Sequence, residues 1–234
     1  TGLIMSWEED STRDWQFPVI IDNTQRVAAG EKIFRYSNTA DIATIDPDKT
    51  NSVADATVSY HIYDGLYRNV QGELQPATAE SYEVSDDGLV YTFKLRQDTK
   101  WSDGQTVTAK DYEYGMKRLC DPAAACPASY LGAVLKNGAK VSEGELPVDE
   151  LGVKALDDFT LEITLENPAD YFVSMTSMSA FMPVREDLVE KYGNEFGGSA
   201  DKQVYNGPFV VSEYSILYPT PHTTFKYFGS LGLI

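Results

Sequence analysis

The stretch "LVYTFKLRQDTKWSDGQTVTAKDYEYGMKRLCDP", residues 89–122, decides the local fold, because it predicts a strand, a turn and a helix in succession. Its first part alternates between two faces, which is typical of a half-buried strand. One face carries Leu89, Tyr91, Phe93 and Leu95, and the other carries Val90, Thr92, Lys94 and Arg96. The "SDG" that follows at 102–104 then turns the chain.

The second part of this stretch predicts a helix that begins near Ala109. Thr108 stands at a favourable N-cap position, and Asp111 three residues later resembles a capping box. Pro122 ends the helix. Side chains at a spacing of about 3.6 residues form one buried face, and these are Tyr112, Met116, Leu119 and Cys120. Folding explains every feature of this segment, and no catalytic group stands out in it.

Other segments extend this pattern in both directions. Strands are expected over 32–37, over "VKALDDFTLEITLENP" at 153–168 as one alternating strand, and after the turn in "YNGPFVVSEYS" at 205–215. Helices are expected over 53–67, 129–138 and 186–193. The apolar segment "YFVSMTSMSAFMPV" at 171–184 contains three methionines and is either core or a plastic ligand surface, and we favour core.

Composition narrows the classes of partner. The chain has 234 residues with 36 Asp plus Glu against 19 Lys plus Arg, and a net charge of −17. This excess of negative charge argues against a nucleic acid or an anionic membrane surface as partner. The sequence has no apolar run of about eighteen residues, so no direct membrane span is expected. The first fifteen residues lack the basic and apolar regions of a secretory signal.

The chain has two cysteines, Cys120 and Cys126, separated by "DPAAA". This spacing is neither that of a C-x-x-C redox motif nor that of a zinc knuckle. A disulfide that closes a short loop and a pair of free thiols both remain open. With only two histidines, His61 and His222, and no cluster around either, no metal site is expected.

The sequence signals no catalytic centre. We find no G-x-S-x-G, no H-E-x-x-H and no phosphate-binding glycine loop. The acidic pairs at 86–87 and 157–158 fall in predicted turns, where Asp is common for backbone reasons. We therefore expect no enzyme, no catalytic residue and no cofactor. The 15 Tyr, 10 Phe and 3 Trp could line an adaptable pocket as well as a core.

The order of several segments resembles one known family. These are "TIDP", the run from "IYDGLY" through "FKLRQDTKWSDGQTVTAKD", "LGVKALDDFTLEITLENPADYF" and "YNGPFVV". The succession is similar to the oligopeptide-binding proteins of ATP-driven (ABC) peptide importers, within the peptide and nickel solute-binding family. It spans residues 32 to about 214.

The resemblance implies an α/β (α+β) fold, namely one lobe of a periplasmic-binding-protein-like clamp. A mixed sheet would form the lobe core from 32–54 and 167–214, and a small α+β subdomain would be inserted over 55–166. Residues 1–31 match nothing in the family, and 215–234 form an atypical tail. The second lobe of the family has no counterpart, so we expect a partial or truncated form.

The resemblance also implies a function and a site. The function is capture of peptides by main-chain recognition in an interlobe cleft, outside the cytoplasm, either in the periplasm or as a cell-surface lipoprotein, with a membrane permease as partner. The implied ligand-binding residues are Asn51, Ser52, Val53, Ala128, Tyr130 and Asn206. Asn206 also suits a simple turn, and Tyr130 could simply pack. Another solute (a nickel complex, haem or an oligosaccharide) remains open, as does a lone lobe that acts as a protein-interaction module.

Overall fold

The computed structural model describes residues 19–20, 33–37, 42–215 and 222–227. Its central layer is a four-stranded antiparallel sheet in the order β5-β6-β8-β7. The strands are Ala79–Val84 (β5), Val90–Leu95 (β6), Val153–Asp157 (β7) and Thr160–Thr164 (β8). The predicted strand at 89–96 is confirmed over Val90–Leu95, and it pairs with the strand at 160–164.

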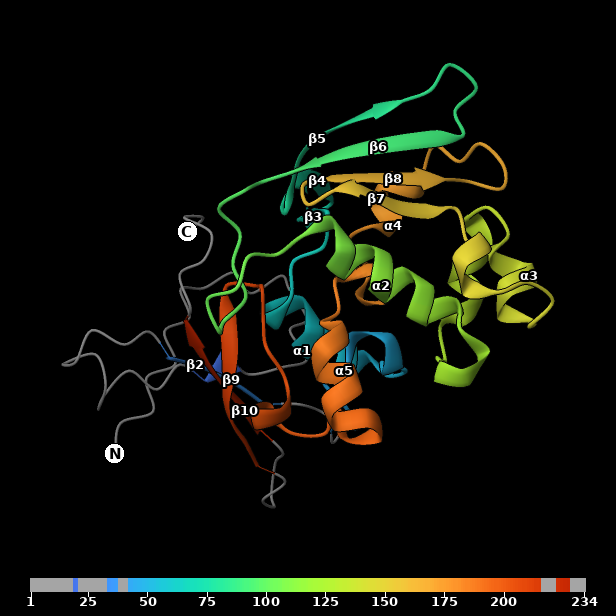
Figure 1. Cartoon of the computed structure of the whole chain (residues 1–234). Helices are drawn as coiled ribbons and strands as arrows, with labels where there is room; N and C mark the ends of the chain where they lie inside the picture. The colour runs from blue at the N-terminus through green and yellow to red at the C-terminus, as the bar shows by residue number, and fades with distance from the viewer. Residues whose placement is uncertain (1–18, 21–32, 38–41, 216–221, 228–234) are drawn as a thin grey trace, which may run out of the picture.

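Helix α2 (Ala109–Cys120) runs beneath this sheet (Figure 1). Its start is confirmed, because the Asp111 carboxylate accepts a hydrogen bond from the Thr108 backbone N–H at 2.7 Å. The same oxygen also accepts bonds from the Thr108 hydroxyl at 3.1 Å and the Trp101 indole N–H at 3.4 Å. The predicted face is buried, since Tyr112 and Met116 are both fully inaccessible to solvent.

One expectation about this sheet was wrong. Residues 153–164 form a hairpin of β7 and β8 and not a single strand. The Asp157 carboxylate accepts the backbone N–H of Phe159 at 2.8 Å and so builds the turn locally. The turn itself agrees with the one predicted at the acidic pair 157–158, and the error was to treat 153–168 as a single strand.

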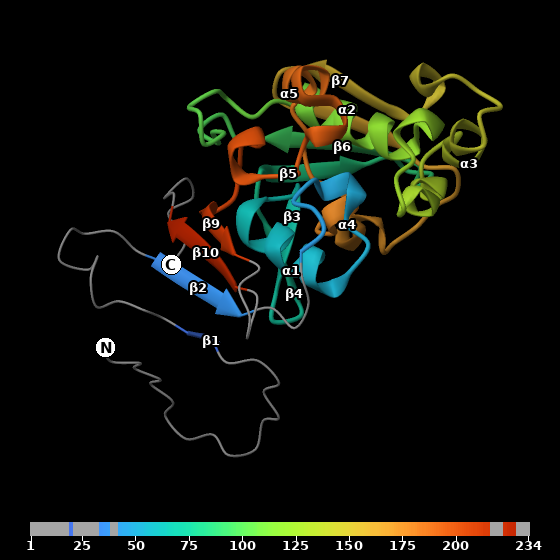
Figure 2. The same cartoon turned by 90° about the horizontal axis from the view of Figure 1, so that it is seen from below.

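The remaining strands form a hairpin and a second sheet. Strands β3 (Tyr67–Val70) and β4 (Glu73–Pro76) form the hairpin. The second sheet has the order β1-β2-β10-β9, with strands Val19–Ile20 (β1), Ile33–Ser37 (β2), Phe209–Ser215 (β9) and His222–Tyr227 (β10). It lies beside α1 (Val53–Ile62), as Figure 2 shows from below.

The second sheet bears on the predicted domain map. The segments at 33–37 and 209–215 both pair with 222–227, a segment from the predicted tail, which lies between them in the sheet. All pairings among the described strands are antiparallel, so the mixed parallel and antiparallel sheet is not seen in this part of the chain. The boundaries at 54/55 and 166/167 stay a prediction.

The other helices are short. They are α3 (Gly138–Ser142), α4 (Phe172–Met175) and α5 (Glu186–Tyr192), which ends at Gly193 as predicted. The helix expected over 129–138 is instead a 3₁₀ helix over Ser129–Val134 followed by α3. Within the described ranges, no helix combines the length and the apolar character that a membrane span requires.

An aromatic cluster joins the sheet to α4. The Phe172 ring packs edge-on against Tyr91 at 5.1 Å between centroids and against Phe181 at 6.4 Å. Phe93 and Phe172 are both fully buried. The prediction that the segment at 171–184 is core is therefore confirmed for Phe172 and Phe181, which hold the chain that follows β8 against the sheet, whereas Tyr171 is 63% exposed.

Replacing Asp111 by Ala should lower the free energy of unfolding by about 1–3 kcal/mol, because the Thr108 and Trp101 donors lose their acceptor at a buried helix start. Urea denaturation followed by circular dichroism would measure this. Asp86→Ala is the matched control, since Asp86 is an exposed turn residue, and it should change stability by less than about 0.5 kcal/mol. Equal effects of the two variants would contradict the capping role.

Candidate functional site: the loop before α1 and its neighbours

The loop before α1 is held by a buried cluster of charges. Arg118 of α2 donates to Asp46 from two nitrogens, at 2.8 and 2.6 Å, and to Asp48 at 2.7 Å. All three side chains are at most 9% exposed. The guanidinium also lies 5.5 Å from the centre of the Phe196 ring. This cluster fixes residues 46–48, which form the start of a 3₁₀ helix over Pro47–Lys49, against α2.

One positive charge faces two carboxyl groups in this cluster. Burial, together with the nearby Asp46 carboxylate, raises the pKa of Asp48 to about 7 despite the opposing effect of Arg118. The second Asp48 oxygen, Oδ1, is buried and has no hydrogen-bond partner among the described residues. The raised pKa means that Asp48 holds a proton to a higher pH than an ordinary carboxyl group does.

Two further contacts hold the loop. The Lys49 ammonium donates to the carbonyl of Ala124 and, at 3.4 Å, to that of Ala125. The Thr50 hydroxyl lies 2.9 Å from the hydroxyl of Ser179. The loop before α1 therefore contacts both the segment at 122–128 and the segment that follows α4.

The predicted residues Asn51, Ser52 and Val53 form the free tip of this loop. Asn51 is exposed, and the Val53 side chain is 83% exposed. The Ser52 hydroxyl caps α1 by accepting the Asp55 backbone N–H at 3.1 Å. The first N–H groups of a helix have no acceptor within it, so the N–H of the exposed residue Val53 is a candidate donor to a ligand, whereas Ala54 is buried.

The predicted residues Ala128 and Tyr130 lie in the segment that follows the Lys49 contact. Ala128 is half-buried, whereas Tyr130 is 73% exposed. Tyr130 borders a cavity of about 560 Å³, which is the size of a small-molecule site. Met175, Met178 and Tyr171 line the same cavity. We call this the Tyr130 cavity.

The structure gives Asn206 a role inside the fold. Its side chain is fully buried, and its amide brackets Asp64, accepting from the backbone N–H at 3.1 Å and donating to the backbone carbonyl at 2.9 Å. Gly207 continues this contact by donating to the Ile62 carbonyl at 2.9 Å. These bonds hold the end of α1 and do not bring Asn206 to the loop tip or to the Tyr130 cavity.

Cys120 and Cys126 are buried free thiols in this structure and do not form the disulfide that the sequence left open. The Cys126 thiol lies 3.5 Å from the Arg118 carbonyl, and burial raises its pKa to about 12. Burial also raises the pKa of Cys120 to about 11. Neither thiol is poised to ionise near neutral pH.

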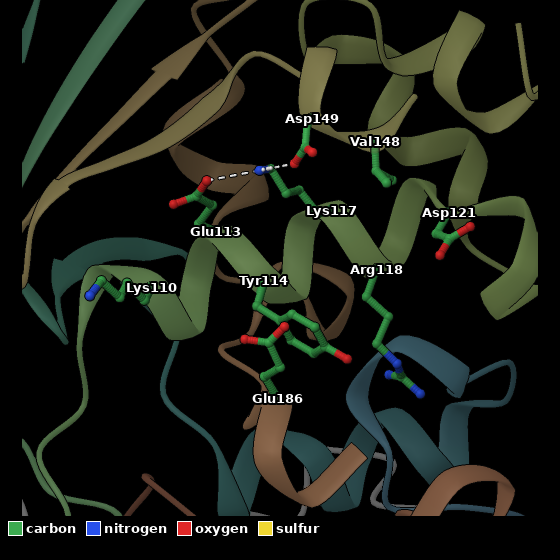
Figure 3. A pocket seen from close by; sticks show the side chains of 9 residues that line it. All are labelled: Lys110, Glu113, Tyr114, Lys117, Arg118, Asp121, Val148, Asp149 and Glu186. Carbon is green, nitrogen blue, oxygen red and sulfur yellow. Dashed lines mark hydrogen bonds and ion pairs between the residues drawn. The ribbon is translucent and has the colours of Figure 1, made fainter. Parts of the chain in front are cut away.

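A second hollow, of about 430 Å³, opens on the outer face of α2 (Figure 3). Lys117 spans it by bonding Glu113 and Asp149, both at 2.9 Å. Arg118 borders this hollow, but its head turns toward the loop before α1. Because Lys117 and Arg118 are already paired with carboxylates, we assign a structural role to the residues of this hollow.

Sequence reasoning missed several residues of the site. Arg118 lies next to the predicted buried face of its helix, and no local pattern points to Asp46 and Asp48. Met175 and Met178 belong to a segment for which we favoured core, although its methionines had suggested a plastic surface. Among the described residues no group of three His, Cys, Asp or Glu side chains is placed to hold a metal ion.

Comparison with known proteins identifies the family. The model of bacterial extracellular solute-binding proteins, family 5 Middle, matches residues 73–216. The chain belongs to this family. This family-5 chain is also 39% identical over 191 residues to the probable deoxycholate-binding periplasmic protein YgiS of Escherichia coli, an alignment covering 80% of this chain and 36% of that protein.

Solved structures agree in sequence and in fold. The substrate-binding domain of an oligopeptide ABC transporter from Bacillus anthracis is 40% identical with a TM-score of 0.74, over 76% of this chain and 34% of that one. Listeria monocytogenes OppA bound to peptide is 38% identical with a TM-score of 0.74, over 75% and 35%. The chain thus spans about a third of the length of its relatives, which fits the single lobe inferred from the sequence.

Arg118→Ala should destabilise the fold by about 3–5 kcal/mol, because it leaves Asp46 and Asp48 buried without a cation. Arg96→Ala removes an exposed pair with Asp98 and should cost at most about 1 kcal/mol. Urea denaturation would compare the two variants. If they cost the same, the cluster does not anchor the loop.

The Asp48 carboxyl should make stability depend on pH. Its pKa is raised from 3.8 to about 7 in the folded state, so between these values only the folded protein keeps the proton. The stability of the wild type should therefore fall as pH rises through this window, by up to about 4 kcal/mol, since a tenfold change in proton affinity is worth about 1.4 kcal/mol.

Asp48→Asn provides the reference for this effect, because its amide stays neutral. The unfolding free energy of both proteins is measured at pH 4, 6 and 8. As the pH rises, the value for the variant should increase relative to the value for the wild type. A difference that stays constant or shrinks would contradict the raised pKa.

Proposed function

We propose that this chain is the first lobe of the substrate-binding component of an ABC importer and that it captures peptides by main-chain recognition. The observation that carries this proposal is the similarity to Listeria monocytogenes OppA bound to peptide, over three quarters of this chain. The location we propose is extracytoplasmic, in the periplasm or as a cell-surface lipoprotein. Membership in a family of solute-binding proteins supports binding over catalysis.

The geometry of the loop before α1 suits this function. The N–H group of Val53 at the start of α1 offers a main-chain donor beside the exposed Val53 side chain. A ligand recognised through its backbone needs such a fixed donor, together with a roomy neighbouring space for side chains. The Tyr130 cavity provides that space, with Met175 and Met178 as adaptable walls.

A permease partner and a second lobe complete the proposal. Two-lobed binding proteins close around a ligand by hinge motion, and the ligand then gains contacts from both lobes. We propose that the present lobe supplies the contacts of Asn51–Val53 and Ala128–Tyr130, and that the remaining contacts come from a second lobe.

A second candidate function is the binding of a different solute. The similarity to a probable deoxycholate-binding protein favours an amphipathic ligand, and the Tyr130 cavity has an apolar wall to match. Nickel complexes, haem, oligosaccharides and a protein partner for the lone lobe are further alternatives that a ligand screen would separate.

Val53→Pro tests main-chain recognition directly. Val53 is the first residue of α1, where proline fits without disturbing the helix but has no N–H to donate. The affinity of this variant for trialanine, measured by NMR titration, should be about 2- to 10-fold lower than that of the wild type, as expected for one lost hydrogen bond. Val53→Ala keeps the N–H and should bind as the wild type does.

The isolated lobe should bind trialanine more weakly than about 1 mM, because the closure energy of a second lobe is missing. Micromolar binding would contradict the division of contacts between two lobes. Equal affinities of the two Val53 variants would contradict main-chain recognition at this loop. Binding of deoxycholate in place of peptide would favour the second candidate.

A further inference from the structure

The walls of the Tyr130 cavity are accessible to a ligand. Tyr130 and Tyr171 are 73% and 63% exposed. Met175 and Met178 are half-buried, so part of each side chain packs on the core and part stays open to solvent. A ligand therefore reaches these four side chains without displacing a residue of the core.

The charge along this cavity is one-sided. Among the described residues that line it, Glu166 is the one with a charged side chain, and none is Lys or Arg. Asn167 adds a neutral polar group, and the remaining walls are apolar or aromatic. A ligand group with a positive charge complements such a lining.

The Glu166 carboxylate has room for a donor from a ligand. Its side chain is exposed, and Oε2 accepts the backbone N–H of Asn137 at 2.9 Å. The other oxygen, Oε1, makes no hydrogen bond or ion pair to the residues that the structure describes. Since an ionised carboxylate accepts bonds at both oxygens, Oε1 is open to an ammonium or guanidinium group.

The backbone holds Glu166 beside the wall formed by residues 130–134. The Glu166 N–H donates to the Val134 carbonyl at 2.9 Å. The next residue of each stretch continues the pairing, because Leu135 forms an antiparallel bridge with Leu165. These contacts fix the acceptor before any ligand arrives, so little order is lost on binding.

The uncharged walls suit the same kind of ligand group. A lysine or arginine side chain has an apolar stem and a cationic head. The stem can lie against Met175 and Met178, which adapt to irregular shapes. The head is attracted to the faces of tyrosine rings, which Tyr130 and Tyr171 expose at the same cavity. A neutral apolar side chain would use only part of this lining.

We propose that the Tyr130 cavity selects peptides that carry a long cationic side chain, with the cationic head at Glu166 Oε1 and the stem against Met175 and Met178. This inference rests on the proposed function, because it assumes that a peptide is held at the loop before α1. It goes further by making Glu166 a residue that determines specificity. The net charge of −17 attracts any cation in a general way, so the test separates local from general attraction.

Arginine and citrulline form a matched pair of probes, because citrulline has nearly the same length and shape but no charge. Arginine replaces one residue of trialanine, at each of the three positions in turn, and citrulline does the same. NMR titration of the isotope-labelled 234-residue chain measures each affinity. At the position that enters the cavity, the arginine peptide should bind roughly 3- to 10-fold more tightly, as expected for an exposed ion pair and a cation–π contact. The amides of Leu131 and Glu166 should shift.

Glu166→Gln removes the charge and keeps an oxygen for the Asn137 N–H, and it should lower the preference for arginine over citrulline at least about 2-fold. Glu83→Gln is its matched control, since Glu83 is an exposed residue of β5 that does not line the cavity, and it should keep the preference. Tyr130→Leu, which removes the ring, should lower the preference as well. Because this second variant is independent of Glu166, a lowered melting temperature of Glu166→Gln does not end the test.

Two results would overturn this inference and leave peptide binding in place. The first is binding of trialanine with equal affinities of the arginine and citrulline peptides at all three positions. The second is an equal loss of preference in Glu166→Gln and Glu83→Gln, which would mean that the attraction is general. If no peptide of the set binds up to about 20 mM, the proposed function itself is contradicted, and this inference with it.

Discussion

The arrangement of the candidate site depends on one buried ionic cluster. Arg118 reaches from α2 to Asp46 and Asp48, which stand 72 and 70 residues earlier in the chain. Charges this deeply buried are tolerated only when they are paired and hydrogen-bonded. The loop before α1 is therefore held in the position in which Asp46 and Asp48 both bond Arg118, directly before α1 begins.

The constraint extends from this cluster to the rest of the site. Once residues 46–48 are seated on α2, Lys49 reaches the carbonyls at 124 and 125, and Thr50 reaches Ser179. The first contact places the loop beside the segment of Ala128 and Tyr130, and the second places it beside the segment of Met178. A surface assembled from three distant stretches thus rests on side-chain contacts to one loop.

The sequence-based predictions succeeded where a periodic pattern had a local cause. The strand at 90–95 and the helix at 109–120 follow from alternation, from the Thr108–Asp111 cap and from Pro122. The turn at 157–158 was predicted, but 153–168 was treated as one strand because the alternation resumes after the turn, and the pairing of β7 with β8 is a tertiary contact. Asn206 was predicted at a cleft, but its amide holds the backbone of Asp64, a contact between residues far apart in the chain.

The sequence by itself determined the family and the principal strand and helix of the central layer, because these rest on local patterns and on motif order. Tertiary structure alone decided that Arg118 pairs with Asp46 and Asp48, and that Met175, Met178 and Glu166 line a cavity with Tyr130. The physical reason is that burial and charge pairing depend on which distant segments of the chain come into contact. The local sequence around a residue does not specify those contacts.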